Sequence, residues 1–335
     1  MHLMALALAV LPFLQPSIAS NIPQYVYKYA PLVWLYSTDP YRPSDLQAQL
    51  DNTTPEVNWT SVADAPSPLT LNNLDQLNAL GNTSVYLTTS GGIAQTPQPS
   101  WWDGISPDSD GRIGNGTGCA IIVVDHGSGE VDAFYFYFYA YNRGDIVLGL
   151  EIGDHIGDWE HNMIRFINGT PQAVWFSQHS SGQAFSYKAL EKQGLRPYTF
   201  SANGTHANYA IVGRHDHTIP SVNLPIGFLL DYTDKGILWD PTLNAYAYTY
   251  DPATATFASD SAVSYPVPWL EFNGRWGDAQ PVGEPTIFGE GKYVAGPNGP
   301  KFKILNRKTV CPSTPCIVLP FRTWAVENGL VTQPE

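Results

Sequence analysis

The densest group of side chains able to do chemistry lies in residues 153–162, Gly-Asp-His-Ile-Gly-Asp-Trp-Glu-His-Asn. The segment holds three carboxylates and two histidines, in a chain with only 14% charged residues. Imidazole and carboxylate groups that gather at strand ends can bind zinc or iron, or act as a general acid and base. Asp158, Glu160 and His161 are therefore candidate catalytic residues.

Further histidines come from other segments. His179 follows the strand-like run 173–178, His206 follows a glycine turn, and residues 213–217 form another histidine-bearing segment. Together with His155, His179 and His206 are candidate ligands of a divalent metal, whose identity the sequence leaves open. The alternative is structural, since no contiguous motif such as His-Glu-x-x-His is present and the same groups could fix loops by hydrogen bonding.

The dipeptide Asn168-Gly169 predicts a two-residue hairpin loop between strands. That loop pairs Met163 with Val174, and a set of polar side chains would then share one face: Asp158, Glu160, Asn162, Ser177 and His179. A four-residue loop over 168–171 would instead place His161 on the face of His179. The sequence does not decide between the two registers.

The elements that must position these groups are strands. Residues 134–141 alternate Phe with Tyr up to Ala140, which predicts a core strand with one dry and one amphipathic face. Helical periodicity is scarce, and short helices are expected only at 43–50, with Ser44 as N-cap, and at 184–193. We predict a mainly β fold, with antiparallel sheets packed as a large sandwich-like single domain with few short helices.

The N-terminus has the pattern of a secretory signal. An apolar run over 3–14 precedes Ser17-Ile18-Ala19, so we expect residues 1–19 to be a signal peptide and 20–335 to be one domain. No second long apolar run follows, and no transmembrane segment is expected after cleavage. Six Asn-x-Ser/Thr sequons fit passage through the secretory pathway, and four of them fall in a glycosylatable excursion at 52–116: the sequons are Asn52, Asn58, Asn82, Asn115, Asn168 and Asn203.

Charge and cysteine content narrow the partners and the compartment. The net charge is −13 and no Lys/Arg cluster occurs, so nucleic acid is excluded as a partner. Three cysteines in an oxidising lumen favour one disulfide. Cys311 and Cys316 bracket four residues and are the expected pair, although a bridge from Cys119 to either would close a larger loop.

Tryptophans beside polar residues suggest a surface for a ligand. Trp159 and Trp239 adjoin Asp, and Trp276 lies two residues before Asp278. An exposed indole can stack on a sugar ring. With Ser177 they form our candidate binding residues. The acidic loops 231–236 and 273–278 lack EF-hand spacing, and ordinary turns account for them better than calcium does.

Several segments together resemble one known family. They are Tyr29-Ala30-Pro31-Leu32-Val33, His155-Ile156-Gly157-Asp158-Trp159-Glu160-His161, Ser177-Gln178-His179, Gly204-Thr205-His206-Ala207, Leu238-Trp239-Asp240-Pro241-Thr242, Trp276-Gly277-Asp278 and Gly296-Pro297-Asn298-Gly299-Pro300-Lys301-Phe302. The combination resembles the vacuolar protein sorting-associated protein 62 family, known from fungi and related to a plant domain of unknown function. The likeness runs from about Tyr25 to Cys316.

The resemblance implies a role in protein targeting to the vacuole and supplies no catalytic assignment. The first hypothesis is thus a glycoprotein, secreted or in the lumen of the secretory pathway or vacuole, that binds a protein cargo, a glycan or a small molecule. A metal-assisted hydrolase or another small-molecule-transforming enzyme using the His/Asp/Glu cluster is the alternative. A lectin-like carbohydrate-binding protein is the third.

Overall fold

The structure is a computed structural model that describes residues 19–147, 149–219, 222–224, 229–283, 285–287 and 290–322. The predicted signal peptide therefore lies almost wholly outside the described residues. The chain is mainly β in one domain, as predicted, with short helices and several antiparallel and mixed sheets. In the described residues no helix has the length and apolar character needed to span a membrane.

The largest sheet has eight strands in the order β20-β19-β5-β6-β9-β10-β11-β23. Its pairings are antiparallel except at β19·β5 and β11·β23, which are parallel. The strands are β5 (Cys119–Gly127), β6 (Glu130–Asn142), β9 (His155–Ile167), β10 (Thr170–Gln178), β11 (Ser181–Ser186), β19 (Ala245–Asp251), β20 (Thr256–Ser259) and β23 (Val318–Leu319).

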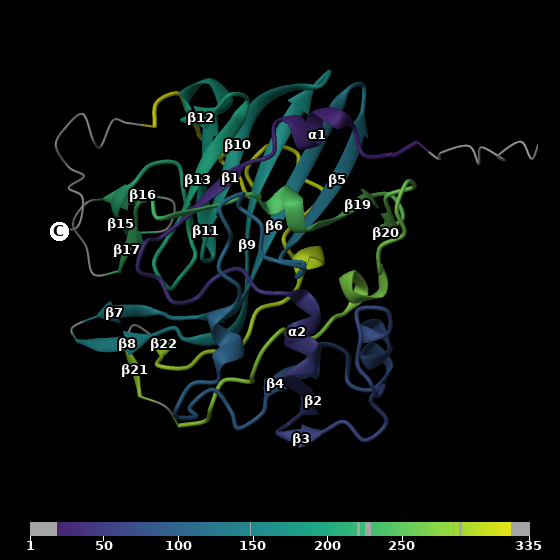
Figure 1. Cartoon of the computed structure of the whole chain (residues 1–335), viewed down its shortest axis with the longest axis vertical. Helices are drawn as coiled ribbons and strands as arrows, with labels where there is room; N and C mark the ends of the chain where they lie inside the picture. The colour runs from purple at the N-terminus through teal and green to yellow at the C-terminus, as the bar shows by residue number, and fades with distance from the viewer. Residues whose placement is uncertain are drawn as a thin grey trace, which may run out of the picture.

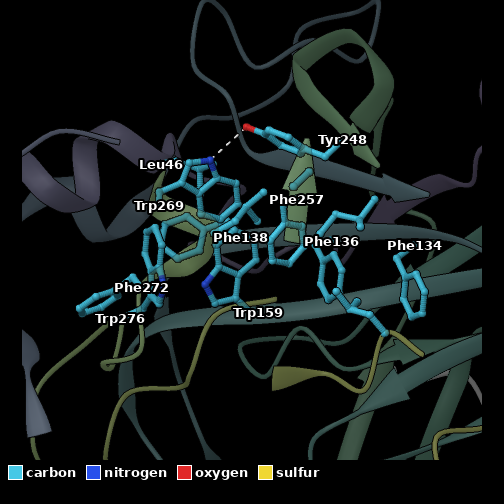
Figure 2. Close-up of a cluster of buried hydrophobic side chains, with 14 of the residues drawn as sticks. Leu46, Phe134, Phe136, Phe138, Trp159, Tyr248, Phe257, Trp269, Phe272 and Trp276 are labelled. Carbon is cyan, nitrogen blue, oxygen red and sulfur yellow. Dashed lines mark hydrogen bonds between the residues drawn. The ribbon is translucent and has the colours of Figure 1, made fainter. Parts of the chain in front are cut away.

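Strand β6 divides the interior into two cores, as its alternating sequence predicts. Phe134, Phe136 and Phe138 face one cluster of buried side chains, which Figure 2 shows packed around Trp159 and Trp269. The tyrosines of the same strand face a second cluster on the other side of the sheet: Tyr135, Tyr137 and Tyr139. Because side chains alternate along a strand, this central strand supplies both cores.

A smaller sheet covers the tyrosine face, which gives the predicted sandwich-like packing. It runs β12-β13-β1-β18, with β14 also paired to β13 (Figure 1). Val33, Leu35 and Trp239 of this sheet are buried against the tyrosine face. The strands are β1 (Leu32–Leu35), β12 (Lys192–Gln193), β13 (Arg196–Ser201), β14 (Asn208–Tyr209) and β18 (Ile237–Trp239).

Short helices and a small sheet cover the phenylalanine face. Residues 52–116 contribute Leu74, Leu77 and Leu87 to this core. The elements on this side include α2 (Leu46–Asp51), β2 (Thr53–Val57), β3 (Thr60–Ser61), β4 (Tyr86–Thr89) and the 3₁₀ helices η1 (Leu74–Ala79), η2 (Asn82–Ser84), η6 (Pro268–Glu271) and η7 (Pro300–Phe302).

The two predicted helices have different outcomes. Helix α2 forms, but its N-cap is Asp45 rather than Ser44, because the Asp45 carboxylate accepts a hydrogen bond from Ala48 N at 3.1 Å. The helix predicted at 184–193 is wrong. That segment holds the end of β11, a short 3₁₀ helix η4 (Tyr187–Ala189) and β12, since residues 181–186 complete the ladder beside β10.

Smaller sheets lie at the end of the large sheet where β9 begins (Figure 1). One runs β16-β15-β17, and two hairpins form beside it. The remaining elements are β7 (Asp145–Val147), β8 (Leu150–Ile152), β15 (Gly213–Ile219), β16 (Val222–Leu224), β17 (Leu230–Thr233), β21 (Thr286–Ile287), β22 (Glu290–Gly291), α1 (Gln24–Lys28), η3 (Ser100–Asp103) and η5 (Pro241–Asn244).

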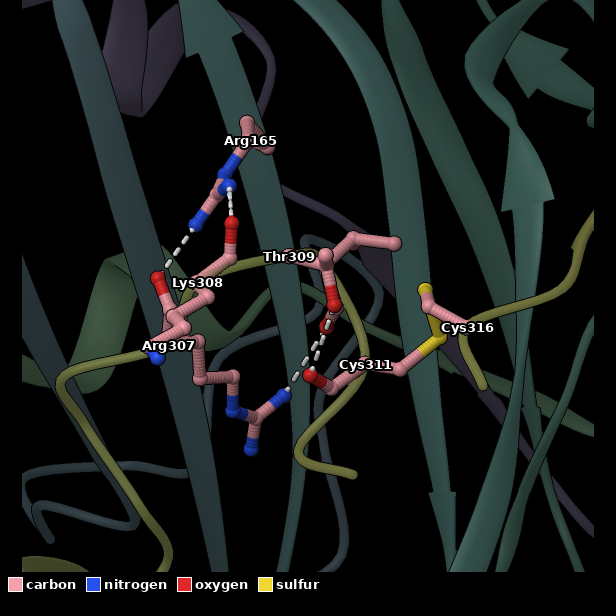
Figure 3. The surroundings of a disulfide bond; sticks show 7 residues. Arg165, Arg307, Lys308, Thr309, Cys311 and Cys316 are labelled. Carbon is pink, nitrogen blue, oxygen red and sulfur yellow. Dashed lines mark hydrogen bonds between the residues drawn. A yellow bond between two sulfur atoms is a disulfide. The ribbon is translucent and has the colours of Figure 1, made fainter. Parts of the chain in front are cut away.

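The C-terminal segment is closed by a local disulfide and is held to the sheet by Arg165. Cys311 and Cys316 form the expected disulfide, and Cys119 is buried and free. Nearby, Arg165 of β9 donates to the carbonyls of Arg307 and Lys308, each at 2.9 Å (Figure 3). Its guanidinium also binds both carboxylate oxygens of Asp132 at 2.7 Å, so this buried ion pair is bidentate.

Replacing Phe136 by Ala should lower the free energy of unfolding by about 3–5 kcal/mol, because its ring is fully buried and the surrounding aromatics cannot close the cavity. Denaturant unfolding followed by tryptophan fluorescence measures the change. The matched control Phe321→Ala, at a ring that is 68% exposed, should change it by less than ~0.5 kcal/mol. Equal effects of the two changes would contradict the assignment of the core.

Candidate functional site

A polar cavity of about 480 Å³ opens where β9 begins. Its wall takes residues from β6, β7, β8, β9 and β15, from the end of β10 and from the segments on either side of η7, so distant parts of the sequence meet there. The side chains that matter for its chemistry are His155, Asp158, Glu160, His179, His217 and Lys303.

The hairpin joining β9 to β10 forms at the predicted turn, but its register is not the predicted one. Asn168 and Gly169 both have positive φ, as a two-residue turn requires, and Thr170 pairs with Ile167. The register then shifts between Pro171 and Ala173. A bulge inserts one unpaired residue, so Met163 lies opposite Trp175 instead of Val174. Neither predicted register survives the bulge.

The bulge also changes which residues share a face. Ser177 was expected on the face of Glu160, and its hydroxyl still reaches that carboxylate. The hydroxyl accepts from His161 N at 2.7 Å and donates to Glu160 Oε2, two neighbouring residues of β9. Ser177 thereby fixes the carboxylate of Glu160. Its position is that of a positioning residue rather than a binding residue in the cavity.

His161 is separated from the other two candidate catalytic residues. It lies opposite Phe136, while Asp158 and Glu160 lie opposite tyrosines. Its ring stacks on Phe136 with centroids 5.0 Å apart, and its Nε2 accepts from Arg307 at 2.8 Å. Burial and the Arg307 charge hold the pKa of His161 well below its usual value, so it is a neutral core residue. Strand alternation alone predicts this separation.

Glu160 is a buried carboxyl group with few charged partners. Its Oε1 accepts from His179 N at 3.1 Å, and its other oxygen accepts from Ser177. Burial, together with the neighbouring charge of Asp158, raises the pKa of Glu160 to about 7. Such a group exchanges a proton near neutral pH, which is a property required of a general acid or base.

The pKa of Asp158 is shifted in the opposite direction from that of Glu160. Burial raises the pKa of this carboxyl, but the hydrogen bond from His206 and the histidine charges around it outweigh burial and lower it overall. His206 Nδ1 lies 3.1 Å from Asp158 Oδ2, and its ring stacks on Tyr139 with centroids 3.7 Å apart. His206 is 1% exposed and does not line the cavity, so it orients Asp158 from behind.

His155 presents a free ring nitrogen at the cavity. Its Nδ1 lies 2.6 Å from the carbonyl oxygen of Gly157, so Nδ1 carries the proton and donates. Burial lowers the pKa of His155, which keeps the ring neutral. Its Nε2 lone pair is then available to accept a hydrogen bond or bind a cation.

The opposite wall holds a second group of charged side chains. His179 Nε2 lies 2.9 Å from Asp231 Oδ2, and His217 Nε2 lies 2.8 Å from Asp145 Oδ2. The two imidazole rings stack with centroids 4.1 Å apart. Burial alone would lower the pKa of His179, but the charge and hydrogen bond of Asp231 outweigh burial and raise it to about 10. The same pairing lowers the pKa of Asp231.

The three predicted metal ligands do not meet in one cluster. In the described part of the chain, the group with metal-compatible spacing is Asp145, His179, His217 and Asp231, whose ligand atoms all lie within 4.8 Å of one another. Of the predicted set it contains only His179. The sequence pointed to His217 as part of the segment 213–217 and to Asp231 as part of an acidic loop, but nothing in the pattern connected them to Asp145 or Lys303.

The tryptophans proposed as binding residues lie in the interior. Trp159, Trp239 and Trp276 are each 0% exposed. Trp159 and Trp276 pack edge to face with centroids 5.4 Å apart, and Trp239 packs on Tyr137. Their indole faces are occupied by other aromatic rings, so they support the walls of the site from within and have no surface for a sugar.

The fold and the cavity define a class of mainly β proteins with a histidine- and carboxylate-lined pocket at one end of a sandwich. Sequence comparison then places the chain: residues 142–281 match the family described as vacuolar protein sorting-associated protein 62. The Saccharomyces cerevisiae vacuolar protein sorting-associated protein TDA6 is 38% identical over 87% of this chain and 68% of its own length. Vacuolar protein sorting-associated protein 62 of the same yeast is 36% identical with the same coverage. The chain belongs to this family.

Solved structures give only a loose likeness in shape. Necrosis and Ethylene inducing Protein 2, from the causal agent of cocoa's Witches Broom disease, has a TM-score of 0.27 at 14% identity, over 58% of this chain and 71% of that chain. The non-toxic HaNLP3 protein has a TM-score of 0.28 at 14% identity, over 71% and 80%. NLPPya in complex with mannosamine has 0.27 at 11% identity, over 69% and 78%.

Replacing Glu160 by Gln should remove a pH dependence of stability. The folded-state pKa of Glu160, about 7, lies above its ordinary value of 4.5, so folding favours the protonated form. Its contribution is fully present below pH 4.5 and is lost as the pH rises through 7. The advantage of wild type over the variant in unfolding free energy should therefore fall by on the order of 3 kcal/mol across this window.

Chemical unfolding of both proteins at a series of pH values, with a chelator present, measures this difference. Asp64→Asn, at an exposed carboxylate, is the control and should leave the pH profile unchanged. A Glu160→Gln profile parallel to that of wild type would show that this carboxyl is ionised normally in the folded protein.

Proposed function

We propose that this chain is a glycoprotein of the secretory pathway or vacuole lumen that acts in vacuolar protein sorting by binding a polar ligand in the cavity at the start of β9. The observation that carries the proposal is the coincidence of the cavity with the motif 155–161. That motif carries much of the resemblance to the family and supplies the cavity's His155, Asp158 and Glu160.

The lining supports binding of a ligand rich in hydrogen-bonding groups. The carboxylates of the cavity and His155 Nε2 can accept hydrogen bonds from a ligand, and the Lys303 ammonium can donate them. One cavity therefore offers both hydrogen-bond acceptors and donors. These side chains are already fixed by buried partners, Ser177 behind Glu160 and His206 behind Asp158. Preorganised groups lose little entropy when a ligand binds. A side chain of a protein cargo, a glycan or a small polar molecule has the matching chemistry.

One observation favours an enzyme as the second candidate. The pKa values of Asp158 and Glu160 are pushed in opposite directions, the first lowered and the second raised to about 7. Neighbouring carboxyls separated in this way serve as base and acid in many hydrolases. The lectin hypothesis has less support, because the three candidate indoles are buried.

The sorting role predicts that the cavity is needed for rescue of a yeast strain that lacks both relatives. The wild-type chain should restore retention of a lumenal vacuolar hydrolase, and Asp158→Asn combined with Glu160→Gln should lose most of that rescue. The hydrolase activity in medium and in cells is the measurement, with equal chain abundance checked by immunoblot. The charge-matched control Asp64→Asn should rescue fully.

Failure of the wild-type chain to rescue would overturn the sorting role. Full rescue by the double variant would instead show that sorting does not use this cavity. Rescue by wild type and loss in Glu160→Gln alone, with retained ligand binding, would move the proposal to the enzyme.

Passage through the secretory pathway predicts glycans at the sequons whose asparagines are exposed: Asn58, Asn82, Asn115 and Asn168. Asn52 and Asn203 are half-buried, and their side chains are engaged by Ala48 O and Arg143. Enzymatic deglycosylation in heavy-oxygen water, followed by peptide mass spectrometry, identifies the occupied sites. Asn168→Gln should remove one glycan's mass. Absence of any glycan from protein expressed in a eukaryotic secretory host would contradict the assignment.

A further inference from the structure

The second wall of the cavity holds two histidines and two aspartates whose side-chain ligand atoms all lie within 4.8 Å of one another. Four side chains converge from four elements: Asp145 begins β7, His179 follows β10, His217 lies in β15 and Asp231 lies in β17. We propose that these four residues bind one divalent transition-metal ion of the zinc class. The proposal is independent of the sorting role.

The known distances are compatible with a tetrahedral site. Bonds of about 2.1 Å from zinc to nitrogen or oxygen place tetrahedral ligand atoms ~3.4 Å apart. His179 Nε2 and His217 Nε2 lie 2.9 Å and 3.8 Å from the same atom, Asp231 Oδ2, and His217 Nε2 lies 2.8 Å from Asp145 Oδ2. These three distances lie within roughly 0.6 Å of the tetrahedral spacing. All four ligand atoms lie within 4.8 Å of one another.

The set of donor atoms matches a divalent ion in charge. Two carboxylates and two imidazoles converge, and one divalent ion neutralises two carboxylates. In the described residues the salt bridges of Asp145 and Asp231 run only to His179 and His217, so no lysine or arginine occupies the group.

Hydrogen bonds from neighbouring side chains hold Asp231 in place, as is usual for a carboxylate that binds a metal. Asp231 is 1% exposed, and its carboxylate accepts from Thr205 Oγ1 and, at 2.6 Å, from Tyr209 OH. Such outer contacts fix the orientation of a ligating carboxylate. His179 has a φ of +55°, an uncommon conformation for a side chain of this type, and it turns the ring toward the group as β10 ends.

The path for an ion and the type of ion also follow from the group. Asp145, His179 and His217 line the cavity, so the group is reached from it, with Asp231 behind them. Two imidazole nitrogens and two carboxylate oxygens suit zinc, cobalt or copper better than calcium or magnesium, which take oxygen ligands. A metal here would share the cavity with His155 and Glu160, and Glu160 would lie beside it because its carboxylate accepts from His179 N.

The test uses the full mature chain, purified without a histidine tag and stripped with a chelator. Cobalt(II) is added as the probe, because its visible absorption reports tetrahedral coordination, and zinc affinity is measured by competition. We expect one equivalent of cobalt with an intense tetrahedral spectrum, displaced by one equivalent of zinc. His217→Gln should weaken zinc binding by about 100-fold or more, because one of four ligands is lost.

His126→Gln is the matched control and should change zinc affinity by less than about threefold, because this ring lies outside the cavity and the group, with its Nε2 2.9 Å from Asp132 Oδ2. Far-ultraviolet circular dichroism confirms that the variants fold. If His217→Gln does not fold, zinc binding is measured in His179→Gln instead, and the wild-type cobalt spectrum still shows whether the site is tetrahedral. No tetrahedral spectrum in wild type, or equal losses in His126→Gln and His217→Gln, would overturn the site.

Discussion

The pairing of β9 with β6 is the constraint on which the rest of the structure depends. Each side chain of β9 lies on the same side of the sheet as the side chain of its partner on β6, and β6 alternates Phe with Tyr. Trp159 and His161 therefore enter the phenylalanine core, and Asp158 and Glu160 enter the tyrosine side. One segment of seven residues thus builds both a dry core and a polar cavity, because the side-chain period of a strand is two.

The same constraint explains why the charged residues can be buried. The tyrosine face is amphipathic, so its hydroxyls can hydrogen-bond to polar side chains where the core gives way to the cavity. Tyr137 OH, for example, donates to Asn162 Oδ1 at 2.9 Å. Closer to the start of β9, Glu160 is hydrogen-bonded to Ser177, and Asp158 is hydrogen-bonded to His206. These two buried carboxylates thus each have a hydrogen-bonding partner, which limits the cost of burying them.

Much of the fold was predictable from local patterns, because those patterns are themselves physical constraints. The Phe/Tyr alternation predicted β6, and Asn168-Gly169 predicted the turn after β9. The bulge beyond Pro171 was not predictable, since it depends on how β10 packs across the sheet and not on the turn. One shifted residue was enough to misplace every pairing from Ala173 onward.

The site was predicted less completely, for a reason that concerns sequence distance. The members on β9 lie within six residues of one another, so their density was visible in the sequence. His217 and Asp231 come from segments noted in the sequence, but no pattern links them to each other or to Asp145. Only the meeting of β7, β15 and β17 beside β10 brings the three together. Two walls of different origin then share one cavity: a rigid wall carried by the central sheet, and a wall assembled from small sheets at its end. A ligand or ion that contacts both walls would couple the position of the small sheets to the charge state of Glu160, since His179 belongs to the second wall and its backbone N–H binds that carboxylate.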